Sequence, residues 1–331
     1  MTHAATLPSM SPAGRMKAAL NLKVPDRVPT FELEFQLTEE LVGRDYLRQN
    51  QLDKAFGRER ERLIRENAEL IVTIYEKLGH DAICLHHLDE AGLCATAREI
   101  RRLVGDKYLL LVHGDGTFAI PDGSHMLDFA YRMVDEPEAL HDQARAMMTG
   151  AIERNKRMLA GGLDGFILCS DYCFNQGPFL SPTQFAAFIT PYLARIIASI
   201  RAEGGFAIKH TDGNIMPILD QLVACRPHAL HSLDPMAGVD IREVKRLVGR
   251  QVALAGNVHC AALQTGTDDD VIASARYAMT YGKPGGGYIF CTSNIPFKGM
   301  RLERYQLAFD VYLQNRDYTD QERLGNGWFR G

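Results

Sequence analysis

The chain has 331 residues, of which 46% are hydrophobic and 24% charged, proportions that are typical of a folded globular protein. Its formal net charge is -4 and no basic run stands out, which argues against nucleic-acid binding. No apolar stretch approaches the roughly 20 residues that span a bilayer, and the N-terminus lacks a signal-peptide core, so we expect a cytoplasmic protein. The seven cysteines form no CxxC pair, which favours free thiols in a reducing compartment.

Strand and helix patterns alternate along the chain after a loose tail at residues 1–12. Short apolar runs predict strands at 28–33, 81–85, 108–112, 165–169, 206–210, 229–232, 251–255 and 288–290. Helical periodicity predicts helices at 15–22, 58–78, 126–133, 138–159, 181–202, 215–224, 240–247, 268–281 and 302–313. The spacing between strands is large enough for right-handed crossovers between parallel neighbours.

This alternation runs to the end of the chain, and no Gly-rich dinucleotide turn follows the first strand. A closed barrel therefore fits the pattern better than an open sheet. We predict an α/β protein with one domain, a (β/α)₈ TIM barrel over residues 13–331.

Polar side chains recur at or just past the predicted strand ends, where a barrel would gather them around one mouth. They are Glu32, Glu34, His86, His87, Asp171, His210, Asp212, His231, Asp234, Asn257, Cys291 and Asn294. For a single residue such as Asp212, Asn214 or Asp234, helix capping is the simpler explanation, by about two to one. The recurrence across several strands favours an active site.

A metal site is one interpretation of these residues. His210 and Asp212 lie two apart on a predicted turn and can chelate, and Cys291 from a distant strand end can complete a zinc set with one open position. His86, His231, His259 and Glu34 are competing ligands. Without a metal, His210 and His231 would act as acid/base groups or hydrogen-bond donors, and Cys291 would be a small buried residue.

Several segments resemble the uroporphyrinogen decarboxylase superfamily, a (β/α)₈ group that also contains corrinoid- and coenzyme M-type methyltransferases. The segments are PDRVP at 25–29, GPFLSP at 177–182, HTDGN at 210–214, LHSLDPMAGVD at 230–240, LAGN at 254–257 and PGGGYIF at 284–290. The resemblance covers nearly the whole chain and implies the barrel fold.

The sequence departs from true uroporphyrinogen decarboxylases at the segments that the resemblance assigns to substrate. Those enzymes have an Arg-rich segment after the first strand that grips carboxylates, whereas this chain reads FELEF at 31–35. Their strand-end aspartate region is His86-His87 here, and their late histidine is replaced by TSN at 292–294. Acidic residues would repel a substrate with many carboxylates, so we do not expect porphyrinogen decarboxylation.

The zinc methyltransferases of the superfamily resemble this chain at their His-x-Cys motif, which reads His210-Thr211-Asp212 here. Their third ligand, a cysteine after the last strand, aligns with Asn294, and Cys291 lies three residues earlier. The resemblance thus implies zinc on His210, Asp212 and Cys291. An oxygen ligand in place of sulfur suits a methyl donor or acceptor oxygen rather than a thiol.

The leading hypothesis is a corrinoid-dependent methyltransferase component. It would move a methyl group from a small methoxy or methylamine-type compound to cobalamin on a separate corrinoid protein, because the chain has no recognisable corrinoid-binding segment. Alternatives are a decarboxylase of another carboxylic acid, with Arg27, Lys209 or Lys298 as its cation, and a non-catalytic small-molecule-binding barrel. A homodimer is a further expectation.

The hypothesis assigns a role to each candidate residue. The catalytic group is His210, Asp212, His231 and Asp234, and the substrate-binding group is Glu32, Glu34, His86, Asp171, Gln176, Asn214, Asn257 and Asn294.

Overall fold

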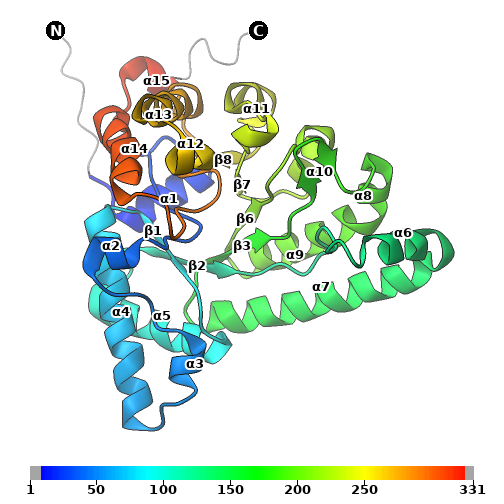
Figure 1. Cartoon of the computed structure of the whole chain (residues 1–331), viewed down its shortest axis with the longest axis horizontal. Helices are drawn as coiled ribbons and strands as arrows, with labels where there is room; N and C mark the ends of the chain where they lie inside the picture. The colour runs from blue at the N-terminus through cyan, green and yellow to red at the C-terminus, as the bar shows by residue number, and fades with distance from the viewer. Residues whose placement is uncertain (1–8, 325–331) are drawn as a thin grey trace.

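The computed structural model describes residues 9–324, so most of the predicted tail lies outside the described residues. Its centre is a curled sheet of seven parallel strands surrounded by helices (Figure 1). In spatial order these strands are β1 (Ala82–Leu85), β2 (Leu109–His113), β3 (Gly165–Cys169), β6 (Phe206–His210), β7 (Ala229–His231), β8 (Ala253–Ala255) and β9 (Tyr288–Ile289). A small antiparallel hairpin, β4 (Cys173–Phe174) and β5 (Gly177–Pro178), follows β3.

Helices connect and cover the strands. They are α1 (Pro12–Leu20), α2 (Thr38–Val42), α3 (Gln49–Leu52), α4 (Arg58–Leu78), α5 (Glu90–Val104), α6 (Met126–Asp135), α7 (Pro137–Ala160), α8 (Pro182–Phe188), α9 (Thr190–Ala202), α10 (Leu219–Ala224), α11 (Ile241–Val248), α12 (Cys260–Thr265), α13 (Asp268–Gly282), α14 (Leu302–Asn315) and α15 (Asp320–Leu324). Short 3₁₀ turns, η1 (Met216–Ile218) and η2 (Pro235–Ala237), precede α10 and α11.

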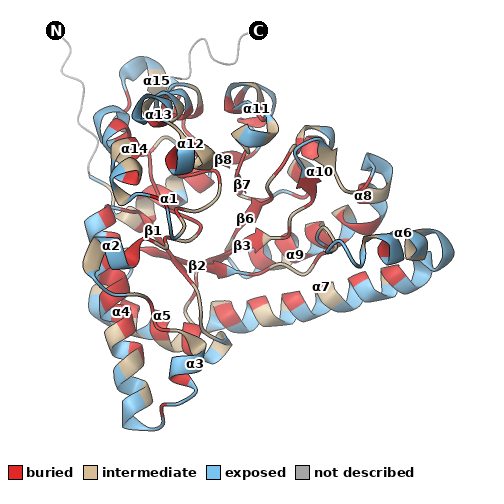
Figure 2. Ribbon diagram, in the orientation of Figure 1, coloured by how far each residue is buried: buried red, intermediate tan, exposed pale blue. Residues whose placement is uncertain are grey.

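The strands are buried on both faces, as Figure 2 shows, because alternate side chains serve two apolar clusters. Ala82, Ile208 and Ala253 belong to a cluster inside the curl of the sheet. Ala207 and Leu254, which are next to Ile208 and Ala253 in their strands, belong to the larger cluster beneath the helices. This two-sided burial explains why the strands read as continuous apolar runs in the sequence.

The eighth strand, predicted at 28–33, forms only isolated bonds with the two edges of the sheet. Phe290 N donates to Pro29 O at 2.9 Å, and Asp81 N donates to Thr30 O at 2.7 Å. Thr30 and Phe290 make a single parallel bridge. Pro29 has no N–H to donate, which is one reason that no ladder forms. The sheet thus has seven regular strands, with this extended segment between β9 and β1.

Several helices differ from the sequence prediction. The predicted helix at 181–202 is broken at Ile189, where Pro191 removes a donor and clashes with the preceding turn. Helix α5 and the β4–β5 hairpin were not predicted. Within residues 9–324 no single helix has the length and hydrophobicity to cross a membrane; only the bent pair α8 and α9 reaches them together.

A buried ion cluster fastens the N-terminal segment to the start of β1. Arg15 and Arg27 both contact Asp81, the latter with Nη1 3.0 Å from Oδ2, and Arg15 also pairs with Asp26. The Asp81 side chain is 0% exposed and accepts a further hydrogen bond from Thr30 N at 3.0 Å. One carboxylate therefore holds α1 and the 28–33 segment against the sheet.

We predict that Asp81→Asn lowers the free energy of unfolding by about 3–5 kcal/mol, because it leaves the buried Arg15 and the partly buried Arg27 without their shared carboxylate. Urea denaturation measures this loss. Asp106→Asn is the control, since the Asp106 side chain is 96% exposed and lies 3.7 Å from Arg101; it should stay within about 0.5 kcal/mol of wild type. Equal effects of the two variants would contradict a structural role for the cluster.

Candidate active site

Two histidines face each other at the ends of adjacent strands. His210 ends β6 and His231 ends β7, and the parallel register places them directly opposite one another. Their Nδ1 atoms are 2.8 Å apart, so one ring donates to the other. Burial lowers the pKa of His210 to about 3, with the charge of Lys209 adding to the effect, and burial also lowers the pKa of His231 well below its usual value. Both rings are therefore neutral, and they share one proton between the two Nδ1 atoms.

Asp212, two residues past the end of β6, is held by side chains from two other loops. Ser232 Oγ donates to its Oδ1 at 2.7 Å, and Asn294 Nδ2 donates to its Oδ2. Its own N–H donates to Asp171 Oδ1 at 3.0 Å. Burial, together with the negative charges of Asp171 and Asp234, raises the pKa of Asp212 to about 6. Asp212 is therefore a positioned carboxylate rather than a helix cap.

Three side chains at this point form a group that can hold a metal ion. His210 Nε2 lies 3.7 Å from Asp171 Oδ1 and 3.8 Å from Asp212 Oδ1, too far for hydrogen bonds. The three ligand atoms lie within 4.8 Å of one another. When His210 Nδ1–H donates to His231, the lone pair of His210 Nε2 points at the two carboxylates, and a cation would relieve that repulsion.

Cys291, the third ligand implied by the sequence, lies elsewhere. It is 0% exposed and belongs to the apolar cluster inside the sheet, two residues past Ile289, which also points inward. It does not belong to the group formed by Asp171, His210 and Asp212. The group contains Asp171, which we had expected to bind substrate, beside His210 and Asp212.

Two other candidate residues cap turns. Asp234 accepts hydrogen bonds from Met236 N at 2.9 Å and from Gly213 N at 3.2 Å. Asn214 Oδ1 accepts from Met216 N at 3.1 Å, at the start of η1. Asp234 also lines a cavity of about 380 Å³ together with Asp212, His259 and Asn294. It thus borders the site while fixing the loop after β7.

The other expected substrate-binding residues have different surroundings. Asn257 is buried and donates from Nδ2 to Leu233 O at 2.8 Å, and Gln176 is exposed in the turn between β4 and β5. Glu34 Oε1 lies 3.2 Å from His87 Nε2. Burial alone would raise the pKa of Glu34. The hydrogen bond with His87 and the electrostatic effect of His86 outweigh burial and lower this pKa to about 2. His86 lies beside His113, with ring centroids 4.7 Å apart.

Sequence reasoning missed residues whose role depends on backbone shape. Ser232 and Leu233 have φ values of 86° and 50°, which non-glycine residues rarely adopt. This turn directs the Ser232 hydroxyl to Asp212. His113 ends β2 as His210 ends β6, so the strand-end rule used for the other residues also selects it.

The uroporphyrinogen decarboxylase (URO-D) family model matches residues 120–303, more than half of the chain. The chain belongs to the uroporphyrinogen decarboxylase family. No curated protein sequence matches it.

Among solved structures, a methyltransferase from Methanosarcina mazei has the same fold, with a TM-score of 0.72 and 17% sequence identity. The match covers 92% of this chain and 99% of that one. PhdJ bound to a substrate intermediate is more distant, with a TM-score of 0.43 and 12% identity over 80% of this chain and 64% of that one. D-allulose 3-epimerase from Methylomonas sp. has a TM-score of 0.45 and 13% identity over 93% of this chain and 97% of that one.

The cations that a decarboxylase of this family would need are engaged elsewhere in this member. Arg27 pairs with Asp81, at the opposite ends of the strands from the mouth. Lys209 is buried, and its Nζ lies 2.9 Å from Asp115 Oδ2 and contacts two carbonyl oxygens. Lys298 Nζ lies 3.0 Å from Asp45 Oδ2 and 3.2 Å from Glu39 Oε2. Each of the three is thus paired with a carboxylate of the chain.

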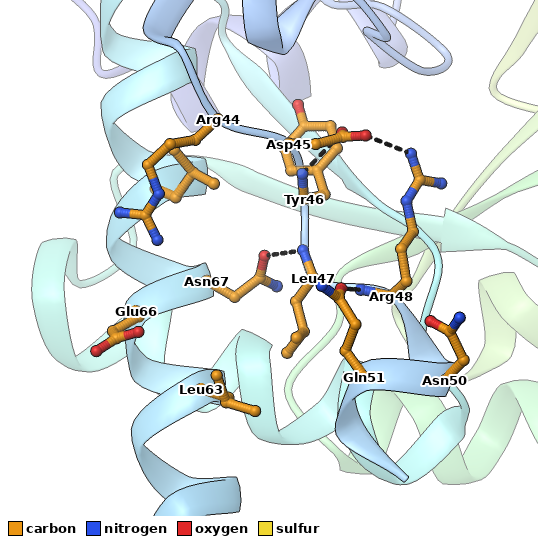
Figure 3. A pocket seen from close by; sticks show the side chains of 11 residues that line it. Arg44, Asp45, Tyr46, Leu47, Arg48, Asn50, Gln51, Leu63, Glu66 and Asn67 are labelled. Atoms are coloured by element: carbon orange, nitrogen blue, oxygen red, sulfur yellow. Dashed lines mark hydrogen bonds and ion pairs between the residues drawn. The ribbon is translucent and has the colours of Figure 1, made fainter. Parts of the chain in front are cut away.

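A larger pocket, of about 550 Å³, lies between α3, α4 and the segment before α3 (Figure 3). It contains none of the strand-end residues. Arg48 and Asp45 pair across 3.1 Å, and Asn67 Oδ1 accepts a hydrogen bond from Leu47 N at 2.9 Å. These contacts hold the segment that carries Arg48, whose Nη1 lies 2.8 Å from His87 Nδ1. The residues that line this pocket therefore hold Arg48 next to His87, at the edge of the candidate site.

Glu32 is buried away from solvent rather than exposed in the mouth. It is 2% exposed and accepts hydrogen bonds from Thr292 and from the Tyr305 hydroxyl. Burial raises its pKa to about 8 from an ordinary value of 4.5, although those hydrogen bonds favour the charged form. The folded protein therefore keeps the Glu32 proton over a range in which the unfolded chain has lost it.

We predict that Glu32 makes stability fall as pH rises from about 5 to about 8, by roughly 3–5 kcal/mol, and has no further effect above that range. Glu32→Gln should remove this component, so that the variant's stability varies less over the same range. Urea denaturation at several pH values measures it. Glu303→Gln, at a side chain that is 72% exposed, is the control; a Glu32→Gln profile parallel to wild type would contradict the prediction.

Proposed function

We propose that this protein is the methyltransferase component of a corrinoid-dependent system. It would take a methyl group from a small methoxy or methylamine-type compound and pass it to cobalamin carried by a separate corrinoid protein. The observation that carries the proposal is the Asp171, His210 and Asp212 group, set in a mouth whose candidate cations are already paired. Family membership and the fold shared with a methyltransferase support it.

The chemistry asks the protein to stabilise a departing heteroatom. When the methyl group leaves, its former oxygen or nitrogen keeps both bonding electrons and must gain a proton or contact a positive charge. His210 and Asp212 would polarise that atom, and the 2.8 Å Nδ1 contact with His231 would hold His210 in one orientation. His231 and Asp234 are the remaining proton-handling candidates. A mouth that holds several carboxylates, and whose three candidate cations are paired, suits an uncharged or cationic methylated compound.

A zinc ion fits this group. Asp171, His210 and Asp212 would supply one nitrogen and two oxygen ligands, which leaves one position for the heteroatom. Bound there, the ion would act as a Lewis acid toward that atom. Ser232 and Asn294 hold Asp212 in place through hydrogen bonds, as partners of metal ligands commonly do. The candidates for positioning substrate are Glu34, His86, Asn257, Asn294, Gln176 and Glu32. Of these, Glu32 is buried, so a substrate would have to enter the interior to contact it.

Methyl transfer to free cob(I)alamin, followed by its visible spectrum, tests the proposal with panels of methoxy and methylamine donors. We predict that at least one donor is demethylated and that His210→Ala lowers the rate by at least about 100-fold. Lys298→Ala should leave the rate close to wild type, because Lys298 lies in an exposed ion pair. Release of CO₂ from a carboxylic acid, lost in Lys298→Ala, would instead identify a decarboxylase.

Metal analysis of protein purified without chelator provides a separate measurement. We predict that His210→Ala removes one equivalent of zinc relative to wild type, because a ligand is lost. His125→Ala is the matched control, since its side chain is 71% exposed and pairs only with nearby residues. An unchanged zinc content in His210→Ala would contradict a metal at this group and leave the metal-free acid/base role.

A further inference from the structure

A second group of potential metal ligands lies at the carboxyl ends of β1 and β2, and the proposed function uses it only through His86, as a candidate for positioning substrate. Cys84, His86 and His113 each offer one ligand atom, and the three atoms lie within 4.8 Å of one another. Leu85 is opposite Val112 in the parallel register, so His86 and His113 occupy equivalent places on neighbouring strands. Their rings meet edge to face, with centroids 4.7 Å apart.

The group contains a buried nitrogen with no suitable partner. Within residues 9–324, His86 Nε2 is fully buried and has no hydrogen-bond partner of ordinary geometry. A weak contact with the backbone of Leu33 raises the pKa of this ring and is the smallest of the effects on it. Buried polar atoms are nearly always paired, so an atom of this kind calls for a ligand, and an ion between the two rings and the thiol would provide one.

The surroundings suit a cation that enters from the mouth. Cys84 is 4% exposed and belongs to the apolar cluster inside the sheet. His113, by contrast, is exposed, so the group is accessible to solvent on the side of His113. The charge of Glu34 acts on both His86 and His113. Glu34 is itself held by His87, at 3.2 Å. The carboxylate of Glu34 therefore lies beside the group without belonging to it, and its charge affects His113 more than the opposing charge of Arg154 does.

We propose that Cys84, His86 and His113 bind a divalent d-block ion, for which zinc is the best match, with a fourth position open toward the mouth. One thiolate and two imidazoles form a ligand set that favours zinc or cobalt over magnesium or calcium. Binding converts the Cys84 thiol to a thiolate and releases its proton to solvent, with no change in oxidation state. The site is chemically distinct from the oxygen-rich group at Asp171, His210 and Asp212, which has no sulfur.

Cobalt(II) titration of the chelator-treated full chain, under anaerobic conditions, tests this site. A thiolate ligand gives cobalt(II) a near-ultraviolet charge-transfer band that imidazole and carboxylate ligands do not produce. We expect this band in wild type, saturating at one thiolate-bound cobalt per chain and displaced by zinc. Cys84→Ser should lack it, and His113→Ala should weaken cobalt binding by at least about tenfold.

Two control variants should keep the band. Cys94→Ser alters a thiol on α5 that contacts Met158 instead, and Asp212→Asn alters only the other group. Absence of the band from folded wild type, or its survival in Cys84→Ser, would overturn the proposal. Where Cys84→Ser fails to fold, His113→Ala decides, because an unchanged cobalt affinity in that variant would equally overturn it. A band that survives in Asp212→Asn separates this site from the proposed methyltransferase centre.

Discussion

The parallel register of the sheet is the constraint on which the candidate site depends. Cys169, His210 and His231 are opposite one another on β3, β6 and β7, so each strand ends at the same height. Residues two positions past a strand end then meet residues of the neighbouring loop, as Asp212 meets Asp171 and Ser232. A shift of one residue in any of these pairings would turn the imidazoles toward the helices.

Electrostatics divides the mouth into groups with different surroundings. Neutral imidazoles arise where burial outweighs nearby charge, as at His210 and His231. Glu34 stays ionised because histidines surround it, whereas Asp212 shares its space with two other carboxylates. Histidine and carboxylate side chains can thus act as ligands, proton carriers or fixed charges, and the neighbouring groups determine which role each one has.

Much of the fold follows from local sequence. Seven of the eight expected strands form, because buried parallel strands are continuous apolar runs, and α4 has the predicted bounds because Gly57 and Gly79 flank it. The 28–33 segment is extended as expected but lacks a ladder. Helix α5 was missed although Asp89 caps it, because its apolar face is narrow.

The site was predicted less completely, because its composition depends on tertiary contacts. Strand-end position selected His210, Asp212 and Asp171, yet only the loop after β3 makes Asp171 a partner of the other two. Side chains alternate along β9 and the residues after it, so Cys291 faces inward with Ile289. Counting residues along the strand predicts this orientation, whereas the alignment with the zinc methyltransferases does not. Capping by Asp234 and Asn214, the simpler explanation for each, is what the structure shows.

The position of the 28–33 segment has a consequence for biosynthesis. Its partners are remote in the chain: the Tyr312 hydroxyl donates to Val28 O at 2.8 Å across a separation of 284 residues. On the ribosome this stretch emerges early and can meet Asp81 soon afterwards, but its partners on β9 and α14 are translated much later. Until then the side of the 28–33 segment that faces β9 stays uncovered, and contacts of such long range form slowly. The nascent polypeptide is therefore most exposed to misassociation just before its synthesis ends, when a chaperone would protect it best.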